Sequence, residues 1–185
     1  SFLLSSCNKM SMNDSMSGSY VFIIEGDFTN SFSIPTSITN NGTLVVQKTH
    51  WQIFSGKTSK VLSYQSNSIL GPTVVMNTGE QVALTVQNSI DESTNIHWHG
   101  LSIPANMDGH PLDVITNGSS LTYSYQVNQR ASFYWYHPHP DGATASQVFK
   151  GLAGGFIVRD TEENALNLPA GSLEIPLAIE REYHK

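Results

Sequence analysis

Apolar and polar side chains alternate with a period of two in the stretch Gln81-Val82-Ala83-Leu84-Thr85-Val86-Gln87. Successive side chains of a β-strand point to opposite faces, so Val82, Leu84 and Val86 would share one face of such a strand. The preceding Asn77-Thr78-Gly79-Glu80 is typical of a turn. The stretch therefore predicts a half-buried strand with one face in the core.

Further β-rich runs lie on both sides of this strand, separated by Gly, Asn and Pro. They cover residues 20–24, 43–46, 61–64, 73–76, 96–101, 121–127, 133–136 and 154–158. Only residues 143–152 have a weakly helical pattern. Many short strands divided by turn signals are typical of a sandwich or a Greek-key barrel. We therefore predict an all-β fold.

The composition supports this prediction and excludes some functions. Hydrophobic residues make up 39% of the 185 residues and charged residues only 13%, which suits a globular β protein better than a disordered chain. The net charge of −6 argues against a nucleic-acid partner, because phosphates require a basic surface. No apolar run reaches the roughly 18 residues that a membrane-spanning helix needs.

The two ends of the chain differ from its middle. Residues 1–18 lack periodicity and are expected to form a flexible tail, residues 19–160 the first folded domain, and residues 161–185 a linker and the start of a next domain, with a strand at 173–179. Leu4-Ser5-Ser6-Cys7 resembles a bacterial lipobox, in which the cysteine is lipidated. This predicts a lipid anchor at Cys7; the alternative is a chance match in a tail.

Four of the seven histidines form two close pairs, His97-Trp98-His99 and His137-Pro138-His139. On a strand, residues two apart project from the same face with their Cα atoms about 6.6 Å apart. Each pair can thus aim two imidazoles at one point, while Trp98 enters the core on the other face. Pro138 lacks an N–H group, so the second pair should lie at a strand end or edge.

Imidazoles without a neighbouring thiolate favour copper, zinc, iron or nickel over calcium or magnesium. Spacing alone leaves the choice among these metals open, and coincident structural histidines are the other interpretation. A zinc hydrolase would require a carboxylate ligand or base beside the pair, and Gly100 stands there instead.

The residues around the pairs resemble the two copper motifs in the first domain of the multicopper oxidases, which include laccases, bilirubin oxidases and cuprous oxidases. The resemblance covers about residues 60–180. It is carried by Gly71-Pro72-Thr73, Gly79-Glu80, Asn95-Ile96-His97-Trp98-His99-Gly100-Leu101, Met107-Asp108-Gly109, Trp135-Tyr136-His137-Pro138-His139-Pro140, Gln147-Val148 and Gly151-Leu152-Ala153-Gly154. It implies a cupredoxin-like Greek-key barrel, here the first of several.

The resemblance also implies a function and a ligand set. Such enzymes couple one-electron oxidation of phenols, bilirubin-like pigments or Cu(I) to the four-electron reduction of O₂ to water at a trinuclear copper cluster. By motif position, His97 would ligate the type 2 copper, His99 and His137 one type 3 copper, and His139 the other. Asp108 matches an acidic residue near the cluster, expected to orient a ligand and deliver protons; the alternative is an ordinary turn residue.

The part of the family pattern that supplies the type 1 copper is missing from this sequence. We therefore expect C-terminal cupredoxin domains, in the same protein or in a second chain, to complete the enzyme. The alternative is a stand-alone copper-binding cupredoxin module without catalysis. His50, His110 and His184 are expected to be structural or surface residues, and Asp141 replaces a histidine common in relatives. Because family members are mostly exported, the resemblance implies a periplasmic or extracellular location.

Overall fold

The computed structural model describes residues 34–54, 56–65 and 68–177. The described residues from Pro35 onward belong to one compact unit. The expected tail, the expected strand at 20–24, Cys7 and His184 lie outside the described residues. No helix in the described part of the chain is long and apolar enough to span a membrane.

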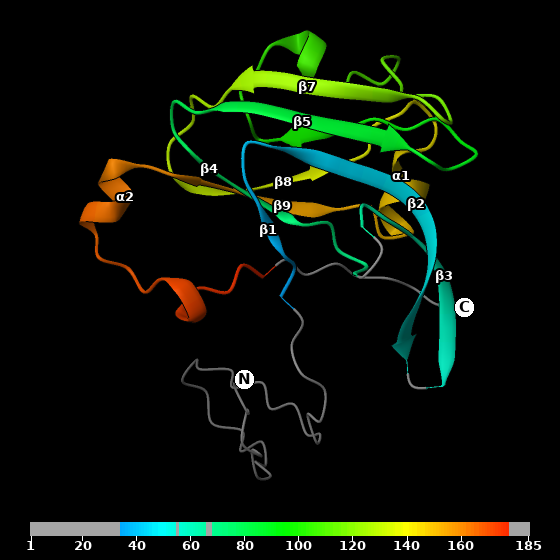
Figure 1. Cartoon of the computed structure of the whole chain (residues 1–185), viewed down its shortest axis with the longest axis horizontal. Helices are drawn as coiled ribbons and strands as arrows, with labels where there is room; N and C mark the ends of the chain where they lie inside the picture. Colours follow the sequence, from blue (N-terminus) through cyan, green and yellow to red (C-terminus); the bar gives the residue numbers. More distant parts are fainter. Residues whose placement is uncertain (1–33, 55, 66–67, 178–185) are drawn as a thin grey trace, which may run out of the picture. The chain divides into compact units, whose positions relative to one another are not determined.

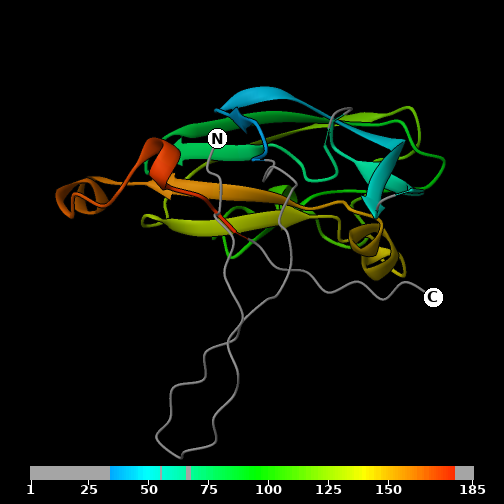
Figure 2. The same cartoon turned by 90° about the horizontal axis from the view of Figure 1, so that it is seen from below.

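Two β-sheets are stacked as two layers, which Figure 2 shows edge-on. The first sheet has the strand order β1 (Ser37–Ile38), β4 (Thr73–Asn77), β9 (Gly154–Arg159), β8 (Ser132–His137) and β6 (His97–His99). The second has the order β3 (Lys57–Ser63), β2 (Asn41–Phe54), β5 (Gln81–Asn88) and β7 (Ser120–Gln126). In Figure 1, β7 and β5 lie above β8 and β9.

Neighbouring strands are both parallel and antiparallel. In the first sheet β4 runs parallel to β1 and β9, whereas β8 is antiparallel to β9 and β6. In the second sheet the first half of β2 pairs in parallel with β5, and its second half turns away to pair antiparallel with β3. The predicted all-β fold is confirmed.

The core lies between the two sheets. Val82, Leu84 and Val86 are fully buried on one face of β5, as the alternation predicts. Trp98 is also fully buried, and its indole lies 5.4–5.9 Å, between ring centroids, from four aromatic rings. These rings belong to Tyr123, Tyr125, Tyr136 and Phe156. Burial of these large aromatic surfaces anchors β6, β7, β8 and β9 to one another.

The α-helices of the described chain are short and lie at opposite ends of the layers, whereas a 3₁₀ helix, Ala105–Met107, lies beside β7 (Figures 1 and 2). Helix α1 (Thr144–Phe149) falls within the predicted helical stretch. Gln147 of α1 is fully buried, donates a hydrogen bond to the Ser93 carbonyl at 2.8 Å, and accepts one from the Thr94 hydroxyl at 2.9 Å. These bonds fix the segment that leads into β6.

The described C-terminal part contains two short helices, and one expectation about it is corrected. The stretch expected as a linker after Asp160 begins with helix α2 (Thr161–Ala165), because the Asp160 carboxylate accepts a hydrogen bond from the Glu163 N–H at 2.8 Å and caps the helix. The strand expected at 173–179 is absent from its described part. Instead a 3₁₀ helix, Gly171–Leu173, is followed by irregular chain to residue 177.

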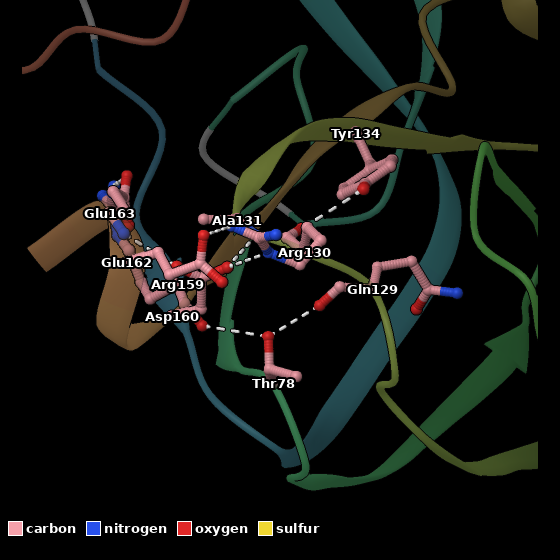
Figure 3. Close-up of polar contacts among 9 residues, drawn as sticks. All are labelled: Thr78, Gln129, Arg130, Ala131, Tyr134, Arg159, Asp160, Glu162 and Glu163. Carbon is pink, nitrogen blue, oxygen red and sulfur yellow. Dashed lines mark hydrogen bonds and ion pairs between the residues drawn. The ribbon is translucent and has the colours of Figure 1, made fainter.

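Arg130 and Arg159 tie α2 to the sheet, as Figure 3 shows. Arg130 pairs with Asp160, its Nε 2.9 Å from Oδ2, and also with Glu162. Arg159 at the end of β9 pairs with Glu163, with Nη1 and Oε1 2.7 Å apart. The chain that leaves β9 is therefore held against the end of this layer.

Candidate metal centre

The two histidine pairs meet at one edge of the first sheet. β6 is the outermost strand and pairs antiparallel with β8, so that His97 lies directly opposite His137. Strand alternation turns His97 and His99 away from the core, into which Trp98 points. His137 ends β8 and Pro138 follows it, so the second pair lies at a strand end as predicted.

The four imidazoles gather at one place. The ring centroid of His97 lies 5.6 Å from that of His99, 5.4 Å from that of His137 and 5.3 Å from that of His139. One coordinating nitrogen from each of His97, His99 and His137 lies within 4.8 Å of the other two. His139 stands beside this three-nitrogen group, 6.1 Å from His137 between centroids. The role of the four as copper ligands stays a prediction.

Local hydrogen bonds determine which nitrogen of His137 is free. Its Nδ1 lies 2.9 Å from the Pro138 carbonyl oxygen, which can only accept, so Nδ1 carries the proton. Nε2 then keeps its lone pair, and it lies 3.2 Å from Nδ1 of His99. Burial lowers the pKa of His137 to about 4; the neighbouring imidazoles add to the decrease and the Pro138 bond opposes it. The ring is therefore neutral at pH 7 and its lone pair is available.

Asp108 orients His97. Nδ1 of His97 donates a hydrogen bond to the Asp108 backbone oxygen at 3.0 Å, and the carboxylate Oδ1 lies at the same distance. With Nδ1 protonated, the Nε2 lone pair of His97 is left for a ligand. Within the described part of the chain, Oδ1 of Asp108 is buried and has no hydrogen-bond partner. Its 3.0 Å contact with His97 Nδ1 therefore lacks the alignment of a hydrogen bond, and its role in proton delivery stays a prediction.

Trp135 is a further residue of the site whose stacking role the sequence pattern did not reveal. It faces His99 across the β6–β8 pair and precedes His137 by two residues, so all three point to the same face. Its indole stacks on His99 with centroids 4.9 Å apart and lies 4.2 Å from the His137 ring. The two-residue spacing of Trp135 and His137 indicated that both side chains share a face. The contact of Trp135 with His99 could be recognised only from the register of β6 and β8.

The remaining described histidines lie apart from the three-nitrogen group. His50 is exposed on β2, in the other sheet. His110 is exposed, and its Nδ1 accepts a hydrogen bond from the Leu112 N–H at 3.3 Å. Asp141, which departs from the family pattern, is also exposed.

The residues present fit copper. The three-nitrogen group consists of imidazoles alone, the donors that copper accepts readily. The lone pair of His137 faces Nδ1 of His99 at a separation that allows the two rings to share either a proton or a metal ion. Nδ1 of His97 and of His137 is each tied to a carbonyl oxygen, which fixes the ring orientation as is usual for metal ligands.

Two stacked sheets with imidazoles gathered at one sheet edge define a cupredoxin-like metal-binding domain. A family model described as "Multicopper oxidase" matches residues 45–163. The chain belongs to the multicopper oxidase family, whose members bind copper.

Three similar proteins illustrate the relationship. The chain is 39% identical over 145 residues to a multicopper oxidase, mco, of Staphylococcus aureus, which covers 76% of this chain. A laccase-like multicopper oxidase, CueO, from Ochrobactrum sp. matches in structure with a TM-score of 0.71 and 34% identity over 76% of this chain. A laccase of Pediococcus acidilactici matches with the same TM-score and coverage and 31% identity. The chain spans 32% of the length of each of these three relatives.

Proposed function

We propose that this chain is the N-terminal part of an enzyme that couples one-electron oxidation of a substrate to the four-electron reduction of O₂ to water. The observation that carries the proposal is the convergence of His97, His99 and His137 on one face, with His139 beside them. These imidazoles would supply half of the ligands of a trinuclear copper cluster. The relatives, of whose length the matched part makes up 32%, are named as oxidases and laccases.

The division of ligands is taken from the family resemblance, and the distances between the rings support it. His99 and His137 would hold one type 3 copper, because Nδ1 of one and Nε2 of the other are only 3.2 Å apart. His97 would hold the type 2 copper through Nε2, since its Nδ1 is engaged by Asp108. His139 would hold the other type 3 copper, consistent with its place outside the three-nitrogen group.

Copper held here would supply the one-electron steps that O₂ reduction requires. The chain's own residues would orient the ligands and move protons. Asp108 would keep the ring of His97 in one orientation, and its carboxylate, 3.0 Å from His97 Nδ1, would take part in proton delivery to the site. Reducing one O₂ to two waters consumes four protons, so a proton acceptor at this position has a direct use.

The rest of the enzyme would come from C-terminal cupredoxin domains, which would supply the other cluster ligands and the type 1 copper that accepts electrons from phenols, pigments or Cu(I). Residues 19–160 would be the first cupredoxin domain, and residues 161–185 would lead to the next. A periplasmic or extracellular location, with a lipid anchor at Cys7, fits the lipobox-like Leu4-Ser5-Ser6-Cys7.

A stand-alone copper-binding module is the alternative. It is less well supported, because the three relatives described above are named for oxidase or laccase activity. The oxidase and the stand-alone module both require copper at the histidines. They differ in whether oxygen is reduced once the C-terminal domains are added.

The test titrates Cu(II) into the chain and into variants in which His97, His99 or His137 is replaced by Ala, with His50→Ala as the control. We expect electron paramagnetic resonance to show imidazole nitrogen coupling in the parent and the control, and weakened binding in each of the three site variants. Oxygen uptake is expected only when the C-terminal domains are present. Unchanged copper binding in all three variants would refute the site. Oxygen uptake by this chain alone would refute the proposal that the C-terminal domains are needed for oxygen reduction.

A further inference from the structure

Asn95 is a fully buried side chain that makes hydrogen bonds with both ends of its amide. Its Oδ1 accepts a bond from the His139 backbone N–H at 2.6 Å. Its Nδ2 donates toward the carbonyl oxygens of Gly109 at 3.2 Å, His110 at 3.0 Å and Asp113 at 3.4 Å. The orientation of the amide is unambiguous, because a backbone N–H only donates and a carbonyl only accepts.

These bonds continue the β6–β8 pairing beyond the point where the backbone ladder stops. The last paired residues are His97 and His137. Asn95 precedes His97 by two residues and His139 follows His137 by two, so Asn95 and His139 would face each other as the next such pair. Pro138 has no N–H to offer. The Asn95 side chain replaces the missing backbone contact and holds His139 in register.

The same side chain also holds the loop that carries Asp108. The backbone of that loop approaches the residue after Asn95 closely: Gly109 has φ +64°, and a Cβ there would lie 2.0 Å from the Ile96 carbonyl oxygen. Only glycine tolerates this approach. Asn95 and Gly109 together fix the Asp108 backbone oxygen against His97.

We propose that Asn95 is a positioning residue of the copper centre, which holds His139 and the Asp108 loop in place relative to β6. The inference rests on the proposed function, because it assigns Asn95 to the ligands named there. It goes further in explaining how the one histidine outside the backbone ladder is held.

The chemistry of the position requires asparagine. Aspartate has almost the same shape, but it would place an acceptor oxygen against three carbonyl oxygens in a buried space. Serine would keep a small polar group without reaching both sides. Asn95→Asp and Asn95→Ser therefore disrupt, in two different ways, the hydrogen bonds by which the Asn95 side chain joins His139 to the Asp108 loop.

Asn88 provides a matched control. It is also fully buried, and its Nδ2 donates to the carbonyls of Glu92 at 2.9 Å and Ile115 at 2.8 Å, while its Oδ1 accepts from the Ile90 N–H at 3.0 Å. Its side-chain bonds reach none of the histidine-bearing segments. Asn88→Asp thus imposes the same kind of structural disturbance away from the site.

The experiment measures Cu(II) affinity of the 185-residue chain and the three variants, at a temperature where circular dichroism shows each to be folded. Loss of a partner that orients a metal ligand typically weakens metal binding about 10–100-fold. We expect a loss of this size in Asn95→Asp and Asn95→Ser, and parental affinity in Asn88→Asp. If the parent binds copper and a folded Asn95 variant binds it equally well, this inference is wrong while the proposed site stands. If the parent binds no copper, both fall.

Amide hydrogen exchange gives a second readout that needs neither copper nor a stable Asp variant. In the metal-free parent the His139 amide should be protected. In Asn95→Ser it should lose that protection while the amides of β8 keep theirs. Free exchange of the His139 amide in the parent would overturn the inference.

Discussion

The indole of Trp135 lies 4.2 Å from the imidazole of His137, measured between ring centroids, with the two planes inclined by 30°. The same indole stacks on His99 at 4.9 Å and 29°. One large ring thus packs against two of the proposed ligands and restricts their rotation. Such packing preorganises a site before any metal arrives.

Trp135 should report on the metal directly. Cu(II) bound to His99 and His137 is expected to quench the Trp135 emission, because the indole contacts both rings. Trp135→Phe should therefore lose most of the copper-dependent quenching, measured by fluorescence titration. Trp51→Phe, in the other sheet, should keep it. Equal quenching in the parent and Trp135→Phe would show that the metal binds elsewhere.

His139→Ala should abolish oxygen reduction when the chain is joined to its C-terminal domains, because one type 3 copper would lose a ligand. The domain should still fold, since the histidine ring contributes little to the core. Oxygen-electrode rates and thermal unfolding check the two parts of this prediction. Full turnover in the variant would contradict the ligand assignment.

Asp108→Asn should keep copper but slow oxygen reduction. The amide preserves the shape and leaves the backbone bond to His97 intact, but it cannot accept the proton that Oδ1 would take up. General acid–base groups contribute about 10²–10⁴-fold to rate, so we expect a loss of about 10²-fold in turnover with unchanged copper content. Asp113→Asn, a nearby exposed carboxylate, serves as the control. Undiminished turnover in Asp108→Asn would leave Asp108 with an orienting role only.

Leu84→Ala tests the core rather than the site. Leu84 is fully buried at the centre of β5, and removing such a side chain typically costs about 2–5 kcal/mol through lost burial and a residual cavity. Urea unfolding should show a decrease in the free energy of unfolding within that range. Gln87→Ala, on the exposed face of the same strand, should change it little. A cost below about 1 kcal/mol would mean that β5 does not pack between the sheets as described.

Asp160 should make stability fall in acid. Hydrogen bonds from the Ala131 and Glu163 N–H groups and from Arg130 hold the pKa of the Asp160 carboxyl well below its usual range. A lowered folded-state pKa contributes stability above the unfolded value of about 3.9, and that contribution is lost as the pH falls through the folded value. Asp160→Asn should therefore lower the melting temperature at pH 7 and show a shallower decrease below about pH 4. Parallel pH profiles for the two proteins would rule out this role.

Much of the fold could be predicted because the decisive strands carry a simple period. β5 and β7 were predictable from their alternating side chains, and β8 and β9 from aromatic and β-branched runs. The second half of β2 was missed, because it is defined by its pairing with β3 rather than by an apolar pattern. The strand expected at 96–101 shortens to His97–His99, because Gly100 adopts φ +86° and ends it.

The site was predictable to the same degree. Two-residue spacing and the surrounding motifs indicated the four histidines and Asp108, since both signals lie within short segments. The contacts of Trp135 with His99 and of Asn95 with His139 join residues that are 36 and 44 positions apart in the sequence. Only the pairing of β6 with β8 brings them together, so no local pattern could reveal them.

The three-residue length of β6 has a consequence for solubility. As the outermost strand of its sheet, β6 presents a row of backbone groups to which a foreign strand could add. Because β6 ends at His99 and the chain turns at Gly100, an added strand could form very few backbone hydrogen bonds with it. The short length of the edge strand β6 thus discourages edge-to-edge aggregation. The same edge carries His97 and His99, which must stay accessible to a metal ion.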